Sequence, residues 1–506
     1  MKTLLGIDVG TSGTKVVLWD PERAQILAEA ISDHTMESPL PGWAEQWPEQ
    51  WWIATQKATR RVVSEAKIAP GDVAAIGLSG QMHGSVFLDG NGDIAGPCML
   101  WCDNRTTAEC EEITALAGKE NLHRWVANPA LPGFTAPKAM WLKRHDPKAF
   151  KCTRHLLLPK DFIRLRLTGE IATDVSDAAG TILYDVAQRT WCDPLIEVLG
   201  LPREWFPPVK ESAEVSGELT TEAAEALGLR AGIPVVGGGA DNAAGAVGCG
   251  IVREGRVFLS LGSSGVVLTP CDTFRVDPQE RLHSFCASVP DQWYLMGCML
   301  TAGLAWTWAR DALCGSGLRE LREWPQLMMK SAGSSPPGAN GVSFLPHLQG
   351  ERSPLNDPAA TGAFAGITLA TREGDLLRAV LEGITFNLRA CLDVARELGC
   401  SVEEVRLTGG GANAPLWRQI CADVLDSEVV LLGTVAGPAL GAALLAGVGA
   451  AIYPDVRATE AAVPLGEAVA PNSEHAARYA ELYSRWRDLY PALRPWMHGQ
   501  APRAEG

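Results

Sequence analysis

Several patterns that would assign this chain to a common class of protein are missing from its sequence. No block of lysine and arginine is present, and 59 acidic residues outnumber 44 basic ones, giving a formal net charge of −15. Nucleic-acid binding requires a surface that neutralises phosphates, so the composition argues against a nucleic-acid partner. A phosphorylated small molecule is not excluded, because backbone amides and a metal ion can hold one locally.

Signals for disulfides, structural zinc and membrane insertion are also absent. The 13 cysteines form no CxxC pair, and the closest two are Cys98 and Cys102. Such spacing suits neither zinc nor a disulfide framework, and scattered reduced thiols are typical of cytoplasmic proteins. The N-terminal apolar run is interrupted by Asp8 and does not resemble a signal peptide. We therefore expect a cytoplasmic protein.

One uncharged segment, residues 431–453, is long enough to suggest a membrane span. Pro438 is expected to start a helix, and glycines interrupt both sides of the segment. The helical part, residues 439–451, is shorter than the roughly 20 residues that cross a bilayer. We predict a buried helix of small residues packed closely against its neighbours, and no membrane partner.

Two nucleotide-binding motifs can be excluded. The order Gly13-Thr14-Lys15 is not that of a P-loop, and it continues into an expected strand. No GxGxxG follows the first strand either. The sequence thus indicates neither a P-loop fold nor a dinucleotide-binding fold.

The elements that are present indicate an α/β fold. A chain of 506 residues is expected to form two to four domains. Two hairpins are predicted, at residues 3–19 and 255–269, each with a loop of glycine and serine or threonine. Both lie near the start of a set of strands and helices, which hints at an internal duplication. The other expected elements are helices at 48–66, 241–249 and 474–494, and strands at 73–79, 235–238 and 405–408.

Three glycine-rich loops follow strands, at residues 10–13, 262–265 and 409–413. Backbone amides and hydroxyls in such loops can form an anion-binding concavity. Taken singly, each loop is equally explained as an ordinary turn.

Two carboxylates lie beside such loops. Asp8 precedes the first loop, and Asp241 lies in the small-residue stretch VVGGGADNAAGAVGCG, residues 235–250. Each acid has an alternative explanation as a turn or helix cap. Together, however, one carboxylate for Mg²⁺ and one for a hydroxyl proton would suit phosphoryl transfer.

The motifs together resemble the FGGY family of carbohydrate kinases, within the actin-like ATPase superfamily, over residues 3–490. The residues that carry the resemblance are Gly6-Ile7-Asp8-Val9-Gly10-Thr11-Ser12, Gly80-Gln81-Met82-His83-Gly84, Trp101-x-Asp103-x-Arg105, the stretches 132–138 and 158–161, Gly239-Ala240-Asp241-Asn242, Gly350-Glu351-Arg352-Ser353-Pro354, residues 362–383 and Gly409-Gly410-Gly411-Ala412-Asn413. One departure is the second loop, Gly262-Ser263-Ser264-Gly265, where relatives commonly have Gly-Thr-Ser-Gly.

The resemblance implies two actin-like (ribonuclease H-like) ATPase domains with a central cleft, each built on a mixed five-stranded sheet. Residues 1–245 would bind mainly sugar, residues 246–490 mainly ATP, and residues 491–506 would form a tail. The implied activity is ATP-dependent phosphorylation of the terminal O5 hydroxyl of D-xylulose. The co-substrates are then a small sugar and ATP, with Mg²⁺ as cofactor.

Site residues follow from the same resemblance. Asp241 is the expected catalytic base, and Asp8 is expected to act in catalysis as the Mg²⁺ ligand. The expected sugar contacts are Gln81, Met82, His83, Asp103 and Asn242, with Trp101 as a candidate for stacking. The expected ATP and phosphate contacts are Gly10, Thr11, Ser12, Gly262, Ser263, Ser264, Gly410, Gly411 and Asn413.

Alternatives stay open at this point. The family also includes kinases for other polyols, so D-ribulose, L-xylulose or xylitol are alternative substrates. A non-catalytic sensor or an actin-like assembly ATPase would be expected to lose Asp241 or the sugar motif, and both are intact. The oligomeric state is not set by the sequence, and because relatives often form dimers a homodimer is one expectation.

Overall fold

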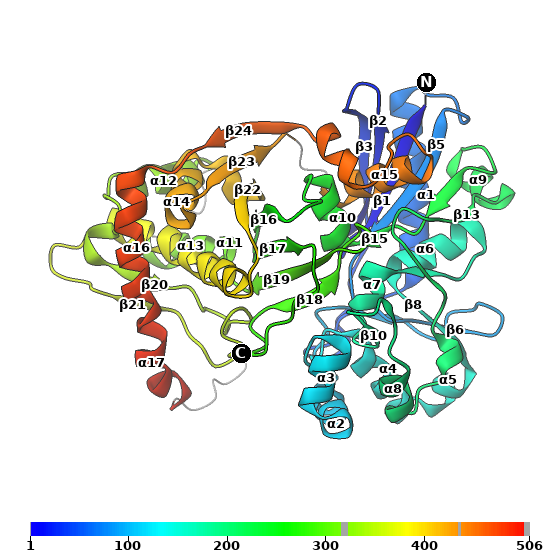
Figure 1. The fold of residues 1–506 in the computed structure, drawn as a ribbon, viewed down its shortest axis with the longest axis horizontal. Coiled ribbons are helices and arrows are strands. Elements are labelled where there is room, and N and C mark those ends of the chain that lie inside the picture. Colours follow the sequence, from blue (N-terminus) through cyan, green and yellow to red (C-terminus); the bar gives the residue numbers. More distant parts are fainter. Residues whose placement is uncertain (1, 315–321, 434–436, 500–506) are drawn as a thin grey trace.

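The fold consists of two mixed β-sheets, each covered by helices (Figure 1). The computed structural model describes residues 2–314, 322–433 and 437–499. The first sheet has the order β13-β14-β5-β1-β2-β3, with β15 also paired to β5. Its strands are β1 Thr3–Val9, β2 Gly13–Asp20, β3 Gln25–Asp33, β5 Val73–Gly80, β13 Val215–Glu218, β14 Pro234–Val236 and β15 Gly239–Ala240.

The second sheet repeats the central pattern of the first. Its order is β18-β19-β17-β16-β22-β23-β24. In both sheets an antiparallel hairpin pairs with a parallel strand, β1/β2 with β5 and β16/β17 with β22. The strands are β16 Gly255–Leu261, β17 Gly265–Cys271, β18 His283–Cys286, β19 Trp293–Met299, β22 Val402–Thr408, β23 Glu428–Leu432 and β24 Leu465–Val469. The α/β class and the two hairpins are therefore confirmed, whereas each sheet has seven strands in place of the expected five.

Helices and short strands complete the two halves. The helices are α1 Pro48–Ala66, α2 Thr107–Ala117, α3 Lys119–Val126, α4 Thr135–His145, α5 Pro147–Cys152, α6 Pro159–Thr168, α7 Val175–Ala179, α8 Asp193–Val198, α9 Thr221–Leu227, α10 Asp241–Gly248, α11 Gly303–Leu313, α12 Trp324–Gly333, α13 Glu373–Glu397, α14 Pro415–Leu425, α15 Gly437–Gly449, α16 Ser473–Arg487 and α17 Leu489–His498. The short strand pairs are β4 Glu45–Gln46 with β7 Cys98–Met99, β6 Val86–Asp89 with β8 Thr153–Leu157, β9 Thr173–Asp174 with β12 Val209–Lys210, β10 Tyr184–Asp185 with β11 Thr190–Trp191, and β20 Ser343–Leu345 with β21 Ala363–Ala365.

Strand β1 is buried on both faces, because helices cover both sides of the first sheet. Leu5 and Ile7 pack in one core with Trp51 of α1. Leu4 packs in a different core, with residues of α15. Since side chains alternate along a strand, Asp8 shares the face of Leu4. The strand therefore ends with a carboxylate on the side of the sheet that α15 covers.

Helix α15 lies very close to the first sheet. A Cβ on Gly6 would be 1.9 Å from the carbonyl oxygen of Ala439, and one on Gly77 would be 1.8 Å from that of Ala442. Only glycine permits such an approach of helix and strand. The prediction of a buried, closely packed helix of small residues is confirmed.

Two helices are exchanged between the halves. Helix α10 directly follows the first sheet in sequence, but its Ala243 and Ala246 pack in one core with Leu268 of the second sheet. Helix α15 comes from the second half of the chain and covers the first sheet. The two helices also pack on each other, where a Cβ on Gly441 would lie 1.7 Å from the carbonyl oxygen of Ala244. The expected boundary between residues 245 and 246 falls inside α10, so we propose a division that assigns α15 to the first domain.

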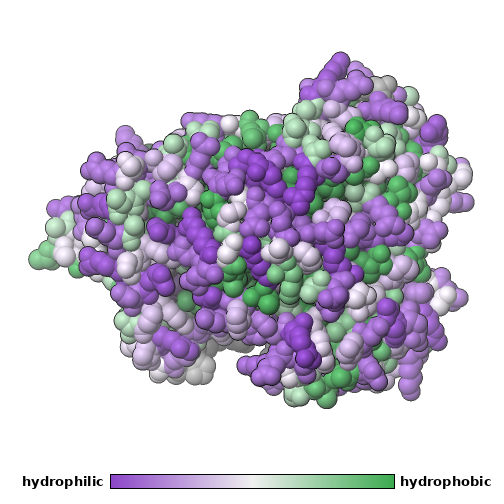
Figure 2. Space-filling view, in the orientation of Figure 1, coloured by the Kyte–Doolittle hydropathy of each residue, from purple (hydrophilic) through white to green (hydrophobic). Residues whose placement is uncertain are grey.

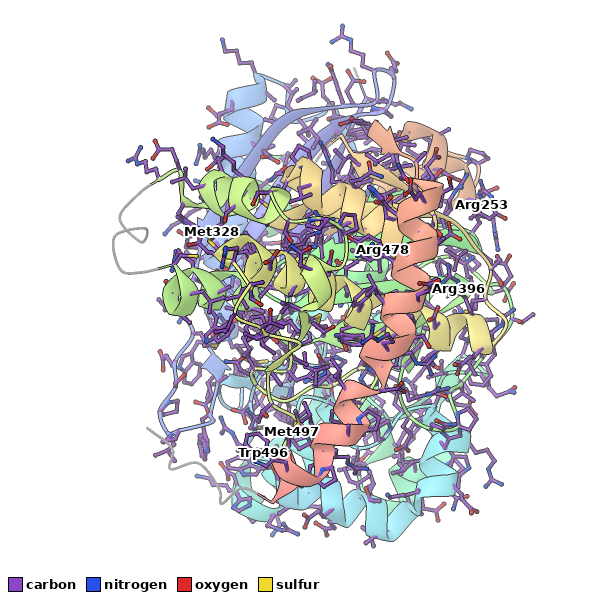
Figure 3. The ribbon with its side chains drawn as sticks, turned by 90° about the vertical axis from the view of Figure 1, so that its left-hand side faces the viewer. Arg253, Met328, Arg396, Arg478, Trp496 and Met497 are labelled. Carbon is purple, nitrogen blue, oxygen red and sulfur yellow. The ribbon has the colours of Figure 1, made fainter. Side chains whose placement is uncertain are left out.

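The expected tail from residue 491 is helical in its first part. Helix α17 continues to His498. Met497 is buried in the hydrophobic core of the second half, whereas Trp496 is 63% exposed (Figure 3). The predicted helix at 474–494 is two helices, since α16 ends at Arg487. Residues 500–506 lie outside the described part of the chain.

The surface in Figure 2 is mostly hydrophilic, with apolar residues dispersed among polar ones, and its lower edge is indented between the two halves. Among the residues that the structure describes, no helix is both long and apolar enough to cross a membrane.

Candidate active site

A cavity of about 240 Å³ lies between the two halves and draws its walls from both. The expected sugar residues Met82, His83 and Asn242 line it, together with Asp241. The remaining lining residues are Trp101, Leu131, Gly133, Phe134, Ser264, Val266, Met296, Cys298 and Arg352. The last five come from the second half, so the first half supplies most of the lining and the second half completes it.

Asp241 is the first residue of α10 and follows β15, which pairs with the end of β5. The strand is held in place by Ser176, whose hydroxyl accepts a hydrogen bond from the Ala240 amide at 3.0 Å. Oδ1 of Asp241 accepts bonds from the backbone and side-chain amides of Asn242, at 2.7 and 3.0 Å. Burial, and then the charge of Asp8, raises the pKa of Asp241 to about 7.

Asp8 is the second carboxylate at this point. Burial raises the pKa of Asp8 to about 6, against the opposing effects of the Ser79 hydroxyl and the Lys15 ammonium. Its Oδ1 is buried without a hydrogen-bond partner in the described structure. Two buried acids that raise each other's cost of ionisation form a site suited to a cation. A hard cation such as Mg²⁺ takes oxygen ligands and keeps several waters, so one such carboxylate fits it. No group of three or more acidic, His or Cys residues that could hold a metal occurs within the described ranges.

His83 has a constrained backbone and a defined tautomer. Its φ of +68° is left-handed, and its carbonyl oxygen accepts bonds from Thr135 Oγ1 at 3.1 Å and Lys138 Nζ at 2.7 Å. Nδ1 lies 2.5 Å from the carbonyl oxygen of Gly180, which can only accept, so Nδ1 carries the proton. Burial is the main effect that lowers the pKa of His83 to about 3. The ring is therefore neutral, and its Nε2 is a hydrogen-bond acceptor.

A buried cluster of charges supports the segment before Asp241. Lys160 Nζ lies 2.6, 2.8 and 3.2 Å from carboxylate oxygens of Asp161, Asp174 and Asp177, and all four side chains are fully buried. Asp174 in turn accepts a bond from the Ser176 hydroxyl at 2.6 Å. The sequence stretch 158–161 thus acts in the structure as part of the support for strand β15.

The first glycine-rich loop is connected to the sugar cavity through hydrogen bonds. Thr11 Oγ1 donates to Gln81 Oε1 and accepts from Trp101 Nε1, both at 3.0 Å. Gln46 Nε2 donates to the Thr11 carbonyl at 2.6 Å, and Gln46 Oε1 accepts from Gln81 Nε2 at 3.0 Å. Gln81 is thus buried behind the loop and does not line the cavity, contrary to the expected sugar contact. The neighbouring Gly10 amide closes the turn by donating to the Gly13 carbonyl at 3.1 Å.

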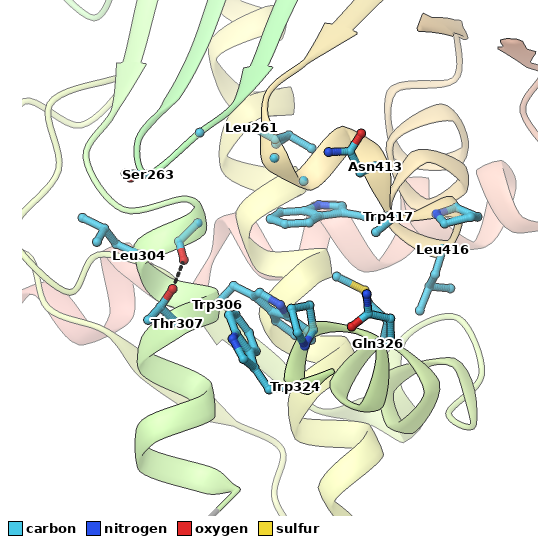
Figure 4. A pocket seen from close by; sticks show the side chains of 18 of the residues that line it. Leu261, Ser263, Leu304, Trp306, Thr307, Trp324, Gln326, Asn413, Leu416 and Trp417 are labelled. Carbon is cyan, nitrogen blue, oxygen red and sulfur yellow. Dashed lines mark hydrogen bonds between the residues drawn. The ribbon is translucent and has the colours of Figure 1, made fainter. Parts of the chain in front are cut away.

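A larger pocket of about 760 Å³ lies in the second half (Figure 4). The expected residues Gly410, Gly411 and Asn413 line it, as do Gly262 and Ser263 from the tip of the β16/β17 hairpin. Its walls are largely apolar and include the rings of Trp306, Trp324 and Trp417. Thr307 Oγ1 donates to the Gly303 carbonyl at 3.0 Å, which fixes the first turn of α11 beside the pocket. This size and lining suit a nucleotide.

The hairpin tip separates the two pockets. Ser263 lines the larger pocket, whereas its neighbour Ser264 lines the cavity that contains Asp241. A phosphoryl group carried from one pocket to the other would therefore pass at this tip. The arrangement suits a reaction between a nucleotide and a small polar molecule.

Comparison with known proteins agrees with this geometry. The models for the N-terminal and C-terminal domains of the FGGY family of carbohydrate kinases match residues 3–248 and 257–450. The chain belongs to the FGGY family of carbohydrate kinases. Like other members of this family, it is a kinase that acts on a small sugar with ATP as co-substrate.

Individual relatives cover almost the full length of this FGGY chain. The xylulose kinase of Escherichia coli (strain K12) is 42% identical over 447 residues, covering 88% of this chain and 90% of that protein. The xylulose kinase of Bacillus subtilis (strain 168) is 36% identical over 456 residues, covering 90% of each. The crystal structure of xylulose kinase from Rhodospirillum rubrum superposes with a TM-score of 0.92 at 30% identity, covering 98% of this chain and 100% of that one.

Asp103 is, after Gln81, a second expected sugar contact that does not line the cavity. The side chain of Asp103 is fully buried. Its carboxylate accepts bonds from Arg105 at 2.6 to 3.0 Å and from the Ala44 amide at 2.7 Å, so its oxygens are already occupied. Arg105 also pairs with Glu45 and stacks on Trp43. In the Trp-x-Asp-x-Arg motif of this FGGY kinase, Asp103 and Arg105 therefore hold the Trp43 loop together, whereas Trp101 lines the cavity.

Several lining residues of this kinase had no role assigned from sequence. Trp306 and Trp417 lie far apart in the chain, and their rings meet with centroids 6.4 Å apart. Nothing in the local sequence distinguishes such tryptophans from core residues. Arg352 is different, because it lies in a recognised family motif, and a cation in that motif was a usable signal.

Proposed function

We propose that this chain transfers the γ-phosphoryl group of ATP to the terminal O5 hydroxyl of D-xylulose, giving D-xylulose 5-phosphate and ADP. The observation that carries the proposal is the position of Asp241 in a small cavity that the hairpin tip separates from a nucleotide-sized pocket. The near-complete coverage of this chain by xylulose kinases supports the choice of sugar.

Asp241 acts as the general base. It accepts the O5 proton while the hydroxyl oxygen attacks the γ-phosphorus in line. A pKa of about 7 places the carboxylate close to the operating pH, where a base combines sufficient ionisation with sufficient basicity. Because phosphoryl transfer has a loose transition state, orientation of the two reactants contributes more than base strength.

Asp8 holds Mg²⁺, directly or through water. The unpartnered, buried Oδ1 of Asp8 is the feature that fits this assignment. When bound, the ion neutralises charge on the β- and γ-phosphates. The raised pKa of both acids indicates that burial makes their ionised carboxylates unfavourable.

The loops divide the remaining contacts. Amides and hydroxyls at Gly10, Thr11, Ser12, Gly262, Ser263 and Ser264 bind the phosphates. Gly410, Gly411 and Asn413 border the adenine and ribose, between the aromatic walls of the larger pocket. His83 Nε2 accepts a hydrogen bond from a sugar hydroxyl, and Asn242 donates one. Met82 shapes the cavity beside Asn242, whose Nδ2 lies 3.7 Å from its sulfur.

A coupled ADP-release assay tests the proposal. With ATP and Mg²⁺ constant, we would compare D-xylulose, D-ribulose, L-xylulose, L-ribulose, glycerol and xylitol. The expected result is a clear preference in kcat/KM for D-xylulose. A preference for another polyol would reassign the substrate within the family, and no sugar-dependent ADP would overturn the kinase assignment for this chain.

The role of Asp241 is tested in the same assay. Asp241→Asn keeps the size and the contacts with Asn242 but cannot accept the O5 proton. Turnover should fall to less than about a hundredth of wild type, the lower end of what a lost general base removes, while D-xylulose still binds in calorimetry. Turnover above about a tenth of wild type would reject the assignment.

A further inference from the structure

Arg352 stands out because its charge is not used by the protein itself. Its side chain lines the sugar cavity from the second half. Among the described residues its guanidinium forms no ion pair or hydrogen bond, and only its backbone is bonded: the amide donates to Glu351 Oε1 at 2.9 Å, and the carbonyl accepts from the Asn356 amide at 2.7 Å. A guanidinium carries five donors and stays charged at all physiological pH values. An arginine that faces a cavity without a partner is therefore available to a ligand.

The loop that carries Arg352 is rigidly built. Glu351 is buried, and its Oε1 accepts a bond from the Leu300 amide at 3.1 Å, while its Oε2 lies 3.1 Å from Asn387 Nδ2 and 3.2 Å from His347 Nδ1. On the other side of Arg352, the Ser353 amide donates to the Cys298 carbonyl at 3.1 Å. The adjacent carboxylate is thus committed to the backbone and side chains around it. The Glu351 carboxylate does not neutralise the Arg352 guanidinium. The bonds on both sides of Arg352 fix the position of its backbone.

Arg352 lines the same small cavity as Asp241 and His83. The Ser353 amide beside it donates to the carbonyl of Cys298, which also lines the cavity. With O5 of the sugar at Asp241, the remaining sugar oxygens occupy the cavity that Arg352 and His83 line.

The chemistry of a ketopentose identifies the group that Arg352 would meet. A 2-ketopentose closes its furanose ring through O5, so a molecule that is phosphorylated on O5 must be in the open-chain form. That form has a free carbonyl at C2, which only accepts hydrogen bonds. His83 Nε2 is itself an acceptor and cannot serve it, whereas a guanidinium can.

We propose that Arg352 is a specificity-determining residue that donates hydrogen bonds to the C2 carbonyl oxygen of the open-chain ketose and so selects ketoses over alditols. This inference rests on the proposed function. A carbonyl oxygen accepts near the plane of its trigonal carbon, whereas the C2 hydroxyl of an alditol stands on a tetrahedral carbon and must also place its own proton. A guanidinium positioned for the carbonyl therefore fits the hydroxyl less well. Arg352 thus acts on recognition of the ketose, while Asp241 acts on the proton.

The test compares a ketose with its alditol in wild type, Arg352→Met and Arg352→Lys. D-xylulose and xylitol have the same carbon chain and differ at C2. Arg352→Met should lower kcat/KM for D-xylulose by about 10- to 150-fold, the range for a hydrogen bond to a charged group. The value of kcat/KM for xylitol should change less than about threefold. Where the turnover of xylitol is too low to measure, its inhibition constant against D-xylulose is compared instead. Arg352→Lys should recover part of the ketose preference.

The controls separate this inference from the proposed function. Arg253→Met, at a partly exposed arginine that does not line the cavity and pairs with Glu403 and Glu460, should leave kcat/KM for both sugars unchanged. Equal losses for D-xylulose and xylitol in Arg352→Met would overturn the role of Arg352 while the kinase assignment stands. A wild type that shows no ketose preference would overturn both, and thermal melts of each variant establish that it is folded.

Discussion

The ionised carboxylate of Asp241 lowers the stability of the fold at the neutral pH at which it acts as a base. Its pKa is about 7 in the fold and near 3.8 when unfolded, so the folded protein keeps a proton over this range that the unfolded chain has released. Ionisation therefore lowers stability progressively from pH 4 to 7, and fully above 7. We expect Asp241→Asn to raise the Tm of the protein without ligands by several degrees at pH 8, and by less as the pH falls toward 4. Differential scanning fluorimetry in EDTA measures this difference in Tm between the variant and wild type.

The matched control is Asp291→Asn, at an exposed acid outside the cavity, which should leave Tm unchanged at both pH values. A Tm of Asp241→Asn equal to or below that of wild type at pH 8 would contradict the account of a strained carboxylate.

His83 contributes a hydrogen-bond acceptor, Nε2, and a left-handed backbone conformation. Two variants separate these two contributions. His83→Ala removes the ring and places alanine at φ +68°, whereas His83→Asn tolerates left-handed backbone better. We expect KM for the sugar to rise about tenfold or more in both, because a buried hydrogen bond and its packing are lost. KM for ATP should change less than about twofold. Initial-rate kinetics decide this, with His123→Ala as control.

A rise confined to KM for ATP would be incompatible with a sugar contact. Loss of stability in His83→Ala that His83→Asn does not share would assign that part of the effect to the backbone.

Site residues that follow one strand or loop were predictable from sequence, and those that depend on distant segments were not. Asp8, Asp241 and the glycine-rich loops are each marked by their own neighbours. Gln81 and Asp103 lie in recognisable motifs, but their side chains are used inside the protein. The tryptophans that line the nucleotide pocket become site residues only when segments far apart in the chain meet.

At the scale of elements, the close packing of α15 depends on glycines, which have no side chain. Gly441→Ala should push α15 and α10 apart, because its Cβ would lie 1.7 Å from a backbone oxygen that cannot move away alone. Overpacking of this kind typically costs about 1–3 kcal/mol or more. We expect a lower Tm or failure to fold. Gly437→Ala in the same helix meets nothing within 4 Å and should be neutral or slightly stabilising.

Equal melting temperatures for Gly441→Ala and Gly437→Ala, measured by calorimetry, would show that the helix pair can relax. The composition of α15 predicted a buried helix of small residues. It could not indicate which sheet the helix covers, because the contacts of α15 with β1 join segments more than 400 residues apart.

At the scale of the whole molecule, a sugar cavity with walls from both halves predicts closure by the sugar itself. Met82 and His83 face Val266 and Met296 across it. A ligand that contacts both walls favours the state in which they are closest. We expect saturating D-xylulose, without ATP, to decrease the radius of gyration in small-angle X-ray scattering.

In His83→Ala the same decrease should require a higher sugar concentration, which ties the compaction to the cavity. An unchanged radius of gyration in wild type at saturating sugar would indicate that the two halves are already fixed before the sugar binds.

The position of α15 also bears on when the protein can fold during its own synthesis. The first sheet begins at Thr3 and is complete at Ala240, yet the helix that covers one of its faces spans Gly437–Gly449. At about 5–20 residues per second, a ribosome needs roughly 20–90 s to reach that helix after it has made β1. Throughout that interval the nascent first domain exposes the apolar face that includes Leu4 and Val17. From the order of elements along the chain we therefore expect this face to need protection by chaperones until translation is almost finished.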